Sequence, residues 1–396
     1  MNIYFNNKRS SKIGAHLNLT TVEELKKNAY PYITTFKKEP FKSFALLKDR
    51  KIGSFFFGAY HHLEDFFSYF EKNLLDDTTL NLRKIYWFLL LGKYFKQALS
   101  KKDELYKFIK SCQYEFEDGS MGFKEHPASP KKYPDIWSTY YALVSLKILG
   151  FLKEYLDSKG KNRVPAEIKR FVLSLQKKKI FIHCKNKDCD ICGEHPPEKT
   201  LFFVLEIFSL LKTDIRIQQS KFLSFISKIT DDFSVVFKLL CLNYLGLSSK
   251  GRIEDLKFLN EHQKDNGGFG ILDDNATINE TFWTVYTLHT YSWLFDYNPA
   301  GIFSYINSKL SKLLKNKENW SPRRIEVVAK LIIVLSLIWE KFIDEVERTI
   351  FKELENKTYL NLEKITCLFG LSDVMGDIIS YINLNYVFNL RILDNQ

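Results

Sequence analysis

Apolar residues recur through much of the chain at the spacing of a helix with one buried face. Residues 101–113 carry apolar side chains at positions i, i+3, i+4 and i+7, and residues 165–176 repeat this pattern. Residues 252–263 repeat it in part, and all three segments end in a glutamine. A unit that returns at this distance along the chain is typical of a helical repeat.

A second kind of helix is predicted after each of these segments. These helices are apolar nearly all round, as in residues 137–149 and 201–211, and each begins near an acidic residue, namely Asp135, Glu198 or Glu280. Acidic side chains near a helix start complement the positive end of its dipole. Helices that are apolar on every side must be covered by others. The sequence therefore predicts an all-α fold, an α/α toroid, which is a double ring of about six helical hairpins.

The repeat pattern divides the chain into three expected parts. Residues 1–55 are expected to be an N-terminal helical or extended segment, and residues 56–315 to form the toroid. Residues 316–396 show a poor repeat register and are expected to be C-terminal helices that complete or extend the ring.

Composition and charge agree with this fold and exclude some functions. The chain has 17 Gly and 10 Pro, which are too few for a sandwich built on many turns, and 58 basic against 47 acidic residues give a net charge of +11. The lysines are scattered and no nucleic-acid module is present, so we expect no nucleic-acid partner. The longest apolar run falls short of the roughly 20 residues that a membrane span needs. We see no leader sequence, and three of the cysteines are clustered as for a metal site instead of being spaced as for a disulfide framework. We therefore expect a cytoplasmic location.

One loop gathers soft metal ligands. Cys184, Cys189, Cys192 and His195 have the ligand types and spacing of a tetrahedral zinc site. If all four bind, the zinc is structural; if one stays away, a substrate thiolate can take its place. A disulfide or redox pair among the thiols is the alternative.

Two glycine-containing stretches resemble a known repeat. Residues 263–270 read Gln-Lys-Asp-Asn-Gly-Gly-Phe-Gly, and residues 113–123 are a longer version. Both resemble the signature of the prenyltransferase and squalene-oxidase repeat family, which shares the α/α toroid. The chain has room for one barrel and is closest in size to the β subunits of protein prenyltransferases. That resemblance implies an aromatic pocket for an isoprenoid, basic residues for its diphosphate, a zinc ion that activates an acceptor thiol, and a helical-repeat α-subunit partner.

The resemblance assigns roles to particular positions, and the chain departs from some of them. Lys132 matches the lysine that holds the diphosphate, and Asp135 matches a zinc-ligand aspartate. Trp137 stands where the zinc-ligand cysteine is expected, and Trp283 stands where a histidine would complete the site. The usual zinc site of the family is therefore absent. Asp135 also has a purely structural interpretation as a helix cap, and Lys132 as a solvated loop charge.

The expected inner helices are rich in aromatic residues. At helical spacing these side chains either line a central cavity or fill the centre of the barrel as core. The residues predicted to line the ligand cavity are Trp137, Tyr141, Phe203, Trp283 and Tyr286.

Three functions remain at this point. The first is a ring that is similar to a prenyltransferase β subunit, binds an isoprenoid diphosphate or another lipid-like ligand, and transfers it to a thiol. The second is a non-catalytic ring that binds a lipid or a protein, with structural zinc. The third is a terpene cyclase, although residues 273–277 lack the expected Asp-x-Asp-Asp pattern.

Overall fold

The computed structural model describes most of residues 65–338. The residues left out of this description are 78, 96–98, 130–132, 161, 178–179, 187–188, 190–196, 214–218, 227–231, 248–252, 273, 292–298, 316–319 and 322–323. The chain divides into the compact unit Ala59–Leu337 and a second unit made of Met1–Gly58 and Ile338–Gln396. The predicted segment 1–55 lies outside the described residues, and the limits at 55 and 315 stay a prediction.

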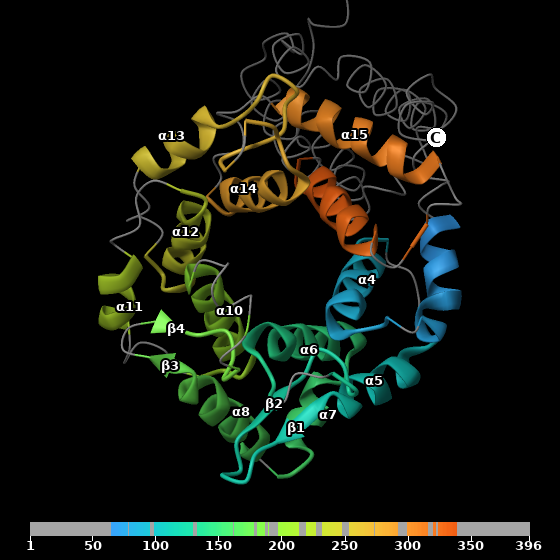
Figure 1. Ribbon diagram of the computed structural model, residues 1–396, viewed down its shortest axis with the longest axis vertical. Coiled ribbons are helices and arrows are strands. Elements are labelled where there is room, and N and C mark those ends of the chain that lie inside the picture. The colour runs from blue at the N-terminus through green and yellow to red at the C-terminus, as the bar shows by residue number, and fades with distance from the viewer. Residues whose placement is uncertain are drawn as a thin grey trace, which may run out of the picture. The chain divides into compact units, whose positions relative to one another are not determined.

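Within the unit Ala59–Leu337 the helices form two concentric rings (Figure 1). The inner ring consists of α4 (Leu82–Phe95), α6 (Ile136–Leu149), α10 (Pro197–Leu210), α12 (Ser234–Tyr244), α14 (Ile278–Thr290) and a helix over residues 324–338. The outer ring consists of a helix over residues 65–73, α5 (Lys102–Ser111), α8 (Arg163–Ser174), α11 (Gln219–Ile226), α13 (Ile253–Glu261) and α15 (Pro299–Lys315). Each outer helix precedes its inner helix in the chain, so the predicted double ring of hairpins is confirmed.

The two rings differ in burial as the sequence pattern indicates. In α6 nearly every residue from Ile136 to Leu149 is buried, whereas α5 buries only Leu105 and Ile109. Inner helices pack on their ring neighbours, α4 on α6, α6 on α10, α10 on α12 and α12 on α14. None of the helices in the described part of the chain is long and apolar enough to cross a membrane.

Charged residues join the first and last inner helices and so close the ring. Arg83 of α4 donates from Nε and Nη2 to the two carboxylate oxygens of Glu326, at 2.7 and 2.9 Å. Lys330, one turn later on the helix over 324–338, donates to Glu326 at 2.6 Å and to Asn279 of α14 at 2.8 Å. A further buried pair, Lys238 with Asp255 at 2.9 Å, links α12 to α13.

Short antiparallel strand pairings follow the outer helices and precede the inner helices. In β1 (Gln113–Glu115) and β2 (Met121–Phe123), Gln113 pairs with Phe123. In β3 (Gln176–Lys177) and β4 (Ile180–Phe181), Gln176 pairs with Phe181. An isolated bridge pairs Gln263 with Phe269 in the third repeat. Each glutamine that ends an outer segment therefore meets a phenylalanine.

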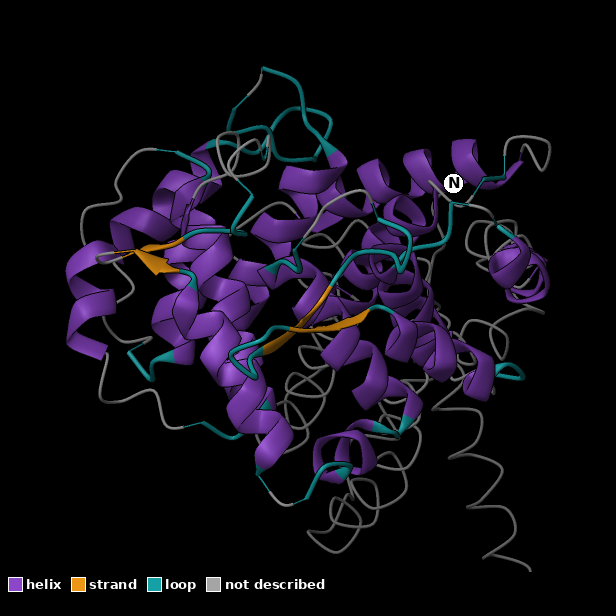
Figure 2. Cartoon of the chain, turned by 60° about the horizontal axis from the view of Figure 1, so that its bottom comes forward, coloured by secondary structure: helices purple, strands orange, loops and turns teal. Residues whose placement is uncertain are grey.

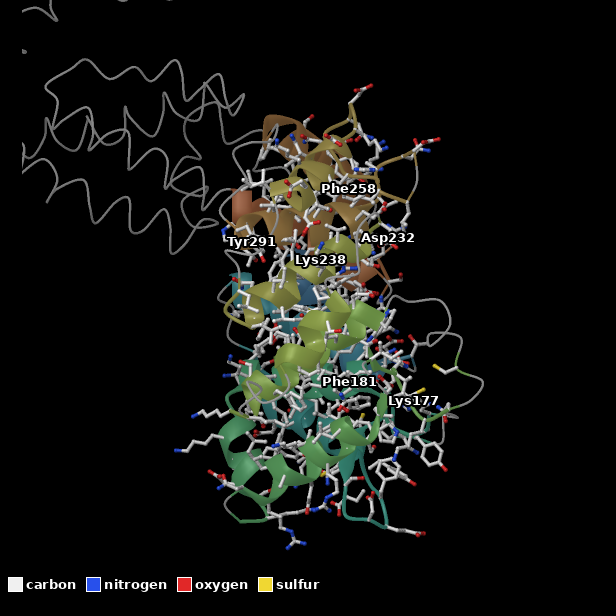
Figure 3. All side chains as sticks on the ribbon, turned by 90° about the vertical axis from the view of Figure 1, so that its left-hand side faces the viewer. Lys177, Phe181, Asp232, Lys238, Phe258 and Tyr291 are labelled. Carbon is white, nitrogen blue, oxygen red and sulfur yellow. The ribbon has the colours of Figure 1, made fainter. Side chains whose placement is uncertain are left out.

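These pairings leave little strand in a helical fold, as Figure 2 shows. In the second hairpin Phe181 is buried and Lys177 is exposed, and Figure 3 labels both in a side view of the ring. The phenylalanines are the apolar anchors of the turns, because Phe123, Phe181 and Phe269 are all buried.

The structure also corrects the register of the repeat. The sequence pattern treated Asp135 and Glu280 as equivalent acidic residues at the helix starts, but Asp135 is the N-cap of α6 and Thr277 is the N-cap of α14. The backbone N–H of Phe123 donates to Thr139 Oγ1, and that of Phe269 donates to Thr281 Oγ1. Glu280 lies in the first turn of α14 instead, where its carboxylate accepts from the N–H groups of Ile271 and Leu272. The acids differ in position because a threonine replaces the aspartate as cap.

Gly267 provides a test of how the turns fit against the outer ring. Its φ is +87°, and a Cβ placed there would overlap the backbone carbonyl of Gly301 on α15. Gly246 also has a positive φ, +69°, but a Cβ there would meet nothing within 4 Å. Gly246→Ala should cost about 1–2 kcal/mol for the left-handed backbone alone. Gly267→Ala should cost about 3 kcal/mol or more, because α15 must also move.

Urea unfolding of the two variants checks this expectation. The midpoint should fall further for Gly267→Ala than for Gly246→Ala. Equal shifts would show that the turn does not press on α15.

Candidate functional site

Three potential metal ligands meet in the loop before α10. The side-chain donor atoms of His183, Cys184 and Cys189 all lie within 4.8 Å of one another. His183 and Cys184 are buried and Cys189 is half-buried. This group, which we call the thiol cluster, could hold a metal ion, since thiolate and imidazole are the usual ligands of zinc.

The thiol cluster only partly matches the predicted ligand set. Cys184 and Cys189 are both in it, whereas Cys192 and His195 lie outside the described residues. The histidine that the structure brings to the cluster is His183, which directly precedes the first cysteine and was not in the predicted set. An Nδ1 to Sγ distance of 3.6 Å separates His183 from Cys189.

Backbone pairing attaches the thiol cluster to the start of α6. The N–H of Ile136 donates to the carbonyl oxygen of His183 at 3.0 Å, and an isolated bridge joins Asp135 to Cys184. Asp135 is bridged on its other side to Phe123 at the end of β2. The first residues of α6 therefore lie between two of the turns that lead into the inner ring.

Asp135 is buried and its carboxylate is fully engaged. One oxygen accepts from the backbone N–H of Ser138 at 2.7 Å and lies 3.1 Å from His183 Nε2. The other accepts from the Ser138 hydroxyl at 2.7 Å. Burial alone would raise the pKa of Asp135, but His183 and these hydrogen bonds outweigh it and lower that pKa. Burial likewise works to lower the pKa of His183, and Asp135 more than offsets it, so the pKa is raised.

A second group of charges lies near the starts of other inner helices. It comprises Arg83, Lys199 and Lys330, which we call the cation cluster, with Glu326 as the carboxylate that pairs with two of them. Lys330 is buried, and its ammonium lies 5.3 Å from the ring centre of Trp87. Arg83 has an exposed side chain, so solvent reaches one edge of the cluster. Lys132, the basic residue that the sequence favoured, lies outside the described residues.

Lys199 differs from the other two cations. Its ammonium lies 4.3 Å from the ring centre of Trp137 and 5.9 Å from that of Phe237, and it contacts no carboxylate among the described residues. Burial, followed by the charges of Lys330 and Arg83, lowers the pKa of Lys199 to about 7. An anion next to Lys199 would favour its charged form and raise this pKa again.

Trp137 links the thiol cluster with the cation cluster. Its ring centre lies 5.0 Å from that of His183, which it meets edge to face, while Lys199 lies over the ring. The residue that stands in place of the expected zinc-ligand cysteine therefore lies between His183 of the thiol cluster and Lys199 of the cation cluster.

The aromatic residues predicted for the cavity are in mutual contact. The ring centroid of Phe203 lies 5.6 Å from that of Trp137 and 6.1 Å from that of Tyr141. It also meets Trp283 at 6.5 Å, and Trp283 meets Tyr286 at 6.2 Å. The five residues therefore belong to one connected layer of rings, which we call the aromatic layer.

The aromatic layer reaches across the ring of helices. Trp87 of α4 meets Phe282 of α14 at 5.7 Å, although the helix over 324–338 stands between these helices in the ring. Phe202 of α10 meets Trp283 of α14 at 5.9 Å past α12. Contacts that pass an intervening helix require the side chains to point to the interior. Both arrangements expected from the sequence, a lined cavity and a filled centre, place these rings inside.

The family of the chain follows from comparison with known domains. The prenyltransferase alpha-alpha toroid domain matches residues 59–233 and 232–317. The chain belongs to this family. The match confirms the resemblance seen in the repeat motifs and is consistent with prenyl binding or transfer. A comparison with curated proteins finds no match.

The toroid's cation cluster was not found from the sequence, although one signal was present. Lys330 interrupts the apolar run of residues 327–335, and Lys199 precedes the apolar run of α10. A single charge inside an otherwise apolar inner helix is unusual enough to mark a site. The acidic segment considered for a cyclase gives no such signal, because Asp274 is exposed and Asp273 lies outside the described residues.

The lowered pKa of Lys199 predicts a pH-dependent effect of its removal. The pKa falls from an ordinary value of 10.5 to about 7 in the toroid, so between these values the unfolded chain binds more protons than the folded one. The cost of burying the charge is complete below pH 7 and is lost progressively above it. Lys199→Met should therefore stabilise the toroid more near pH 6 than near pH 9.5.

Urea midpoints at the two pH values measure this difference. Lys102→Met on the exposed face of α5 is the control and should show the same small effect at both. A difference between Lys199→Met and the native chain that does not change with pH would contradict the lowered pKa.

Proposed function

We propose that the toroid binds an isoprenoid diphosphate, with its head group at the cation cluster and its chain against the aromatic layer. The observation that carries this proposal is the excess of positive charge near one carboxylate, where Lys330 is buried, Lys199 is half-buried and Arg83 is exposed. Arg83 and Lys330 pair with one carboxylate, that of Glu326, and Lys199 contacts none among the described residues. Buried charges are normally paired, and an unpaired one is costly.

A diphosphate group has the charge that the cation cluster lacks. Arginine and lysine donate strong hydrogen bonds to phosphate oxygens, and such bonds are strongest where water is excluded. Lys199 of α10 lies over the ring of Trp137, and Lys330 of the helix over 324–338 lies over the ring of Trp87. An anion between them would be held above aromatic surface.

The aromatic layer supplies the apolar surface for the isoprenoid chain. Trp137, Tyr141, Phe203 and Trp283 are all buried, and Tyr286 is partly exposed. Large aromatic side chains contribute much of the apolar contact area at ligand sites. The proposal therefore needs both halves of the ligand, and each half can be tested separately.

Calorimetric titration of the full chain with farnesyl diphosphate, inorganic diphosphate and farnesol tests the proposal. Farnesyl diphosphate should bind more tightly than either fragment. Lys199→Ala should weaken its binding about tenfold to a hundredfold, because a charged hydrogen bond is lost. Lys102→Ala, on the outer ring, should leave the affinity unchanged. Equal affinity for farnesol and farnesyl diphosphate would contradict the assignment of the cation cluster.

The pH dependence of binding distinguishes the role of Lys199 from a general effect of charge. Since Lys199 has a pKa of about 7, binding of an anion must add a proton to it at higher pH. The affinity for farnesyl diphosphate should therefore fall between about pH 7 and pH 9. Lys199→Arg, which stays protonated, should remove most of this fall. An unchanged profile in Lys199→Arg would exclude Lys199 as the titrating group.

The second part of the proposal concerns the thiol cluster. Its two thiols and one imidazole suit zinc better than a hard cation such as magnesium. A zinc ion there would favour the thiolate form of an acceptor thiol that binds to it. Because Trp137 contacts both His183 and Lys199, a thiol at the cluster would lie next to the head group of the bound isoprenoid. The proposed activity is transfer of the isoprenoid to that thiol, with a helical-repeat α-subunit as the partner.

A non-catalytic ring that binds a lipid or a protein is the second candidate. It is supported by Trp137, which replaces a ligand of the family's usual zinc site, and by Asp135, whose oxygens are engaged with Ser138 and His183. Metal analysis together with a thiol-transfer assay separates the two candidates. Transfer of farnesyl or geranylgeranyl to a cysteine peptide supports the enzyme. Bound zinc without transfer, with and without an α-subunit, leaves the binding function.

A further inference from the structure

The donor atoms of the thiol cluster already lie near the distances of a metal site. Ligands of tetrahedral zinc at about 2.0–2.3 Å from the ion are separated from one another by roughly 3.3–3.8 Å. His183 Nδ1 and Cys189 Sγ are 3.6 Å apart, and the Cys184 thiol lies within 4.8 Å of both. Only a small inward movement of the half-buried Cys189 and of Cys184 is needed to surround an ion.

The two ring nitrogens of His183 have separate partners. Nε2 is directed to Asp135 at 3.1 Å, while Nδ1 is directed to the thiol of Cys189. A neutral imidazole that donates its Nε2–H to a carboxylate has its lone pair on Nδ1. A histidine ligand whose second nitrogen donates to a carboxylate is held in one tautomer and one orientation.

We propose that His183 Nδ1, Cys184 and Cys189 bind the metal and that Asp135 is the positioning residue of His183. This inference rests on the proposed zinc and names its ligands. It changes two expectations from the sequence. The histidine ligand is His183 in place of His195, and Asp135, which matched a metal-ligand position, acts through His183 instead of binding the ion.

The surroundings of Asp135 favour this second role. Its two oxygens already accept from the N–H and the hydroxyl of Ser138, as required of the N-cap of α6. The Asp135 oxygen that caps α6 lies 3.1 Å from Nε2 of His183, so the start of α6 fixes the orientation of this imidazole. The backbone bond from Ile136 N to His183 O and the bridge between Asp135 and Cys184 hold the two segments together independently of any metal.

The fourth coordination position of the metal ion is not assigned to any of these residues. Cys192 follows Cys189 at the spacing of a paired zinc ligand. With His183 as the imidazole ligand, the inference assigns no role to His195. The inference therefore predicts that two histidines of the same loop respond differently to substitution.

Zinc stoichiometry and affinity of the full chain, measured by competition with a coloured chelator, provide the first test. His183→Ala should lower zinc affinity at least about a hundredfold, while His195→Ala should leave it within about threefold of the native value. Cobalt-substituted native protein should show thiolate-to-cobalt absorption. The d–d bands should shift in His183→Gln and stay unchanged in His195→Ala.

The outcomes of this test separate the inference from the proposed zinc. If the native chain binds no zinc or cobalt, the zinc of the proposed function and this inference both fail. If the native chain binds metal and His195→Ala, not His183→Ala, loses it, only the ligand assignment is overturned. Cys189→Ser, at the half-buried edge of the cluster, gives a second variant should His183→Ala fail to fold.

Substitution of Asp135 tests the positioning role. Asparagine is as good an N-cap as aspartate, so Asp135→Asn keeps an oxygen to cap α6 and removes the charge beside His183, while its amide group would donate to the Ser138 hydroxyl in place of accepting from it. It should weaken zinc binding about tenfold to a hundredfold and shift the cobalt spectrum, and the urea midpoint of the metal-free protein should fall because the charge paired with His183 is lost. Thr277→Ala, which removes the cap of α14, should lower that midpoint and leave zinc affinity unchanged. Native zinc affinity and an unchanged cobalt spectrum in Asp135→Asn would show that Asp135 is only a cap.

Discussion

The inner helices of this protein are apolar on nearly every side, and this property determines where its chemistry can lie. A helix of this kind has to be covered by an outer helix on one side and by the other inner helices on the rest. Residues such as Leu143 and Leu146 of α6 are fully buried as a result. A charged side chain inside such a helix needs a partner, as Lys238 has in Asp255 and Lys330 has in Glu326. The thiol cluster, Arg83, Lys199 and Glu326 lie near helix starts, and Lys330 lies one turn beyond Glu326.

The arrangement at the helix starts combines a structural and a chemical role in the same residues. Arg83 and Lys330 close the ring through Glu326 and also form the cation cluster. Asp135 caps α6 and also contacts His183. Breaking a buried charge pair by removing one partner is costly, so these residues resist substitution on stability grounds alone. Lys199 is the exception, because it has no carboxylate partner among the described residues and contributes nothing evident to closure.

The fold could be predicted from the sequence because two patterns indicate it. Helices with one apolar face alternate with helices that are apolar all round, and the glutamine and glycine signals repeat between them. The register of the repeat was predicted less well. Acidic residues were taken as equivalent, yet Asp135 corresponds to the cap Thr277, while Glu280 binds the backbone of its own turn. Sequence spacing cannot show whether an acid caps a helix or lies three residues inside it.

The candidate site was predictable only where its residues are close in the chain. The spacing of Cys184 and Cys189 indicated a metal site directly, but the choice of His183 depends on a backbone pairing with α6, a segment some fifty residues earlier. The cation cluster draws one residue from each of three inner helices, and nothing local relates Arg83 to Lys330. Their proximity follows from closure of the ring. A sequence pattern indicates that the ring closes, but it does not indicate which residues of the inner helices then meet.

The pairing of a glutamine with a phenylalanine before each inner helix has a consequence for the history of this chain. In the second repeat Gln176 meets Phe181 as in the others, and the thiol-bearing loop follows this phenylalanine, where the first and third repeats have residues 124–134 and 270–276. Because the anchor precedes the variable stretch, one turn can be exchanged for another without disturbing its neighbours. Each repeat is thus an independent place for new chemistry to evolve, and a single ancestral scaffold can acquire a metal in one sector while the remaining sectors keep their original form.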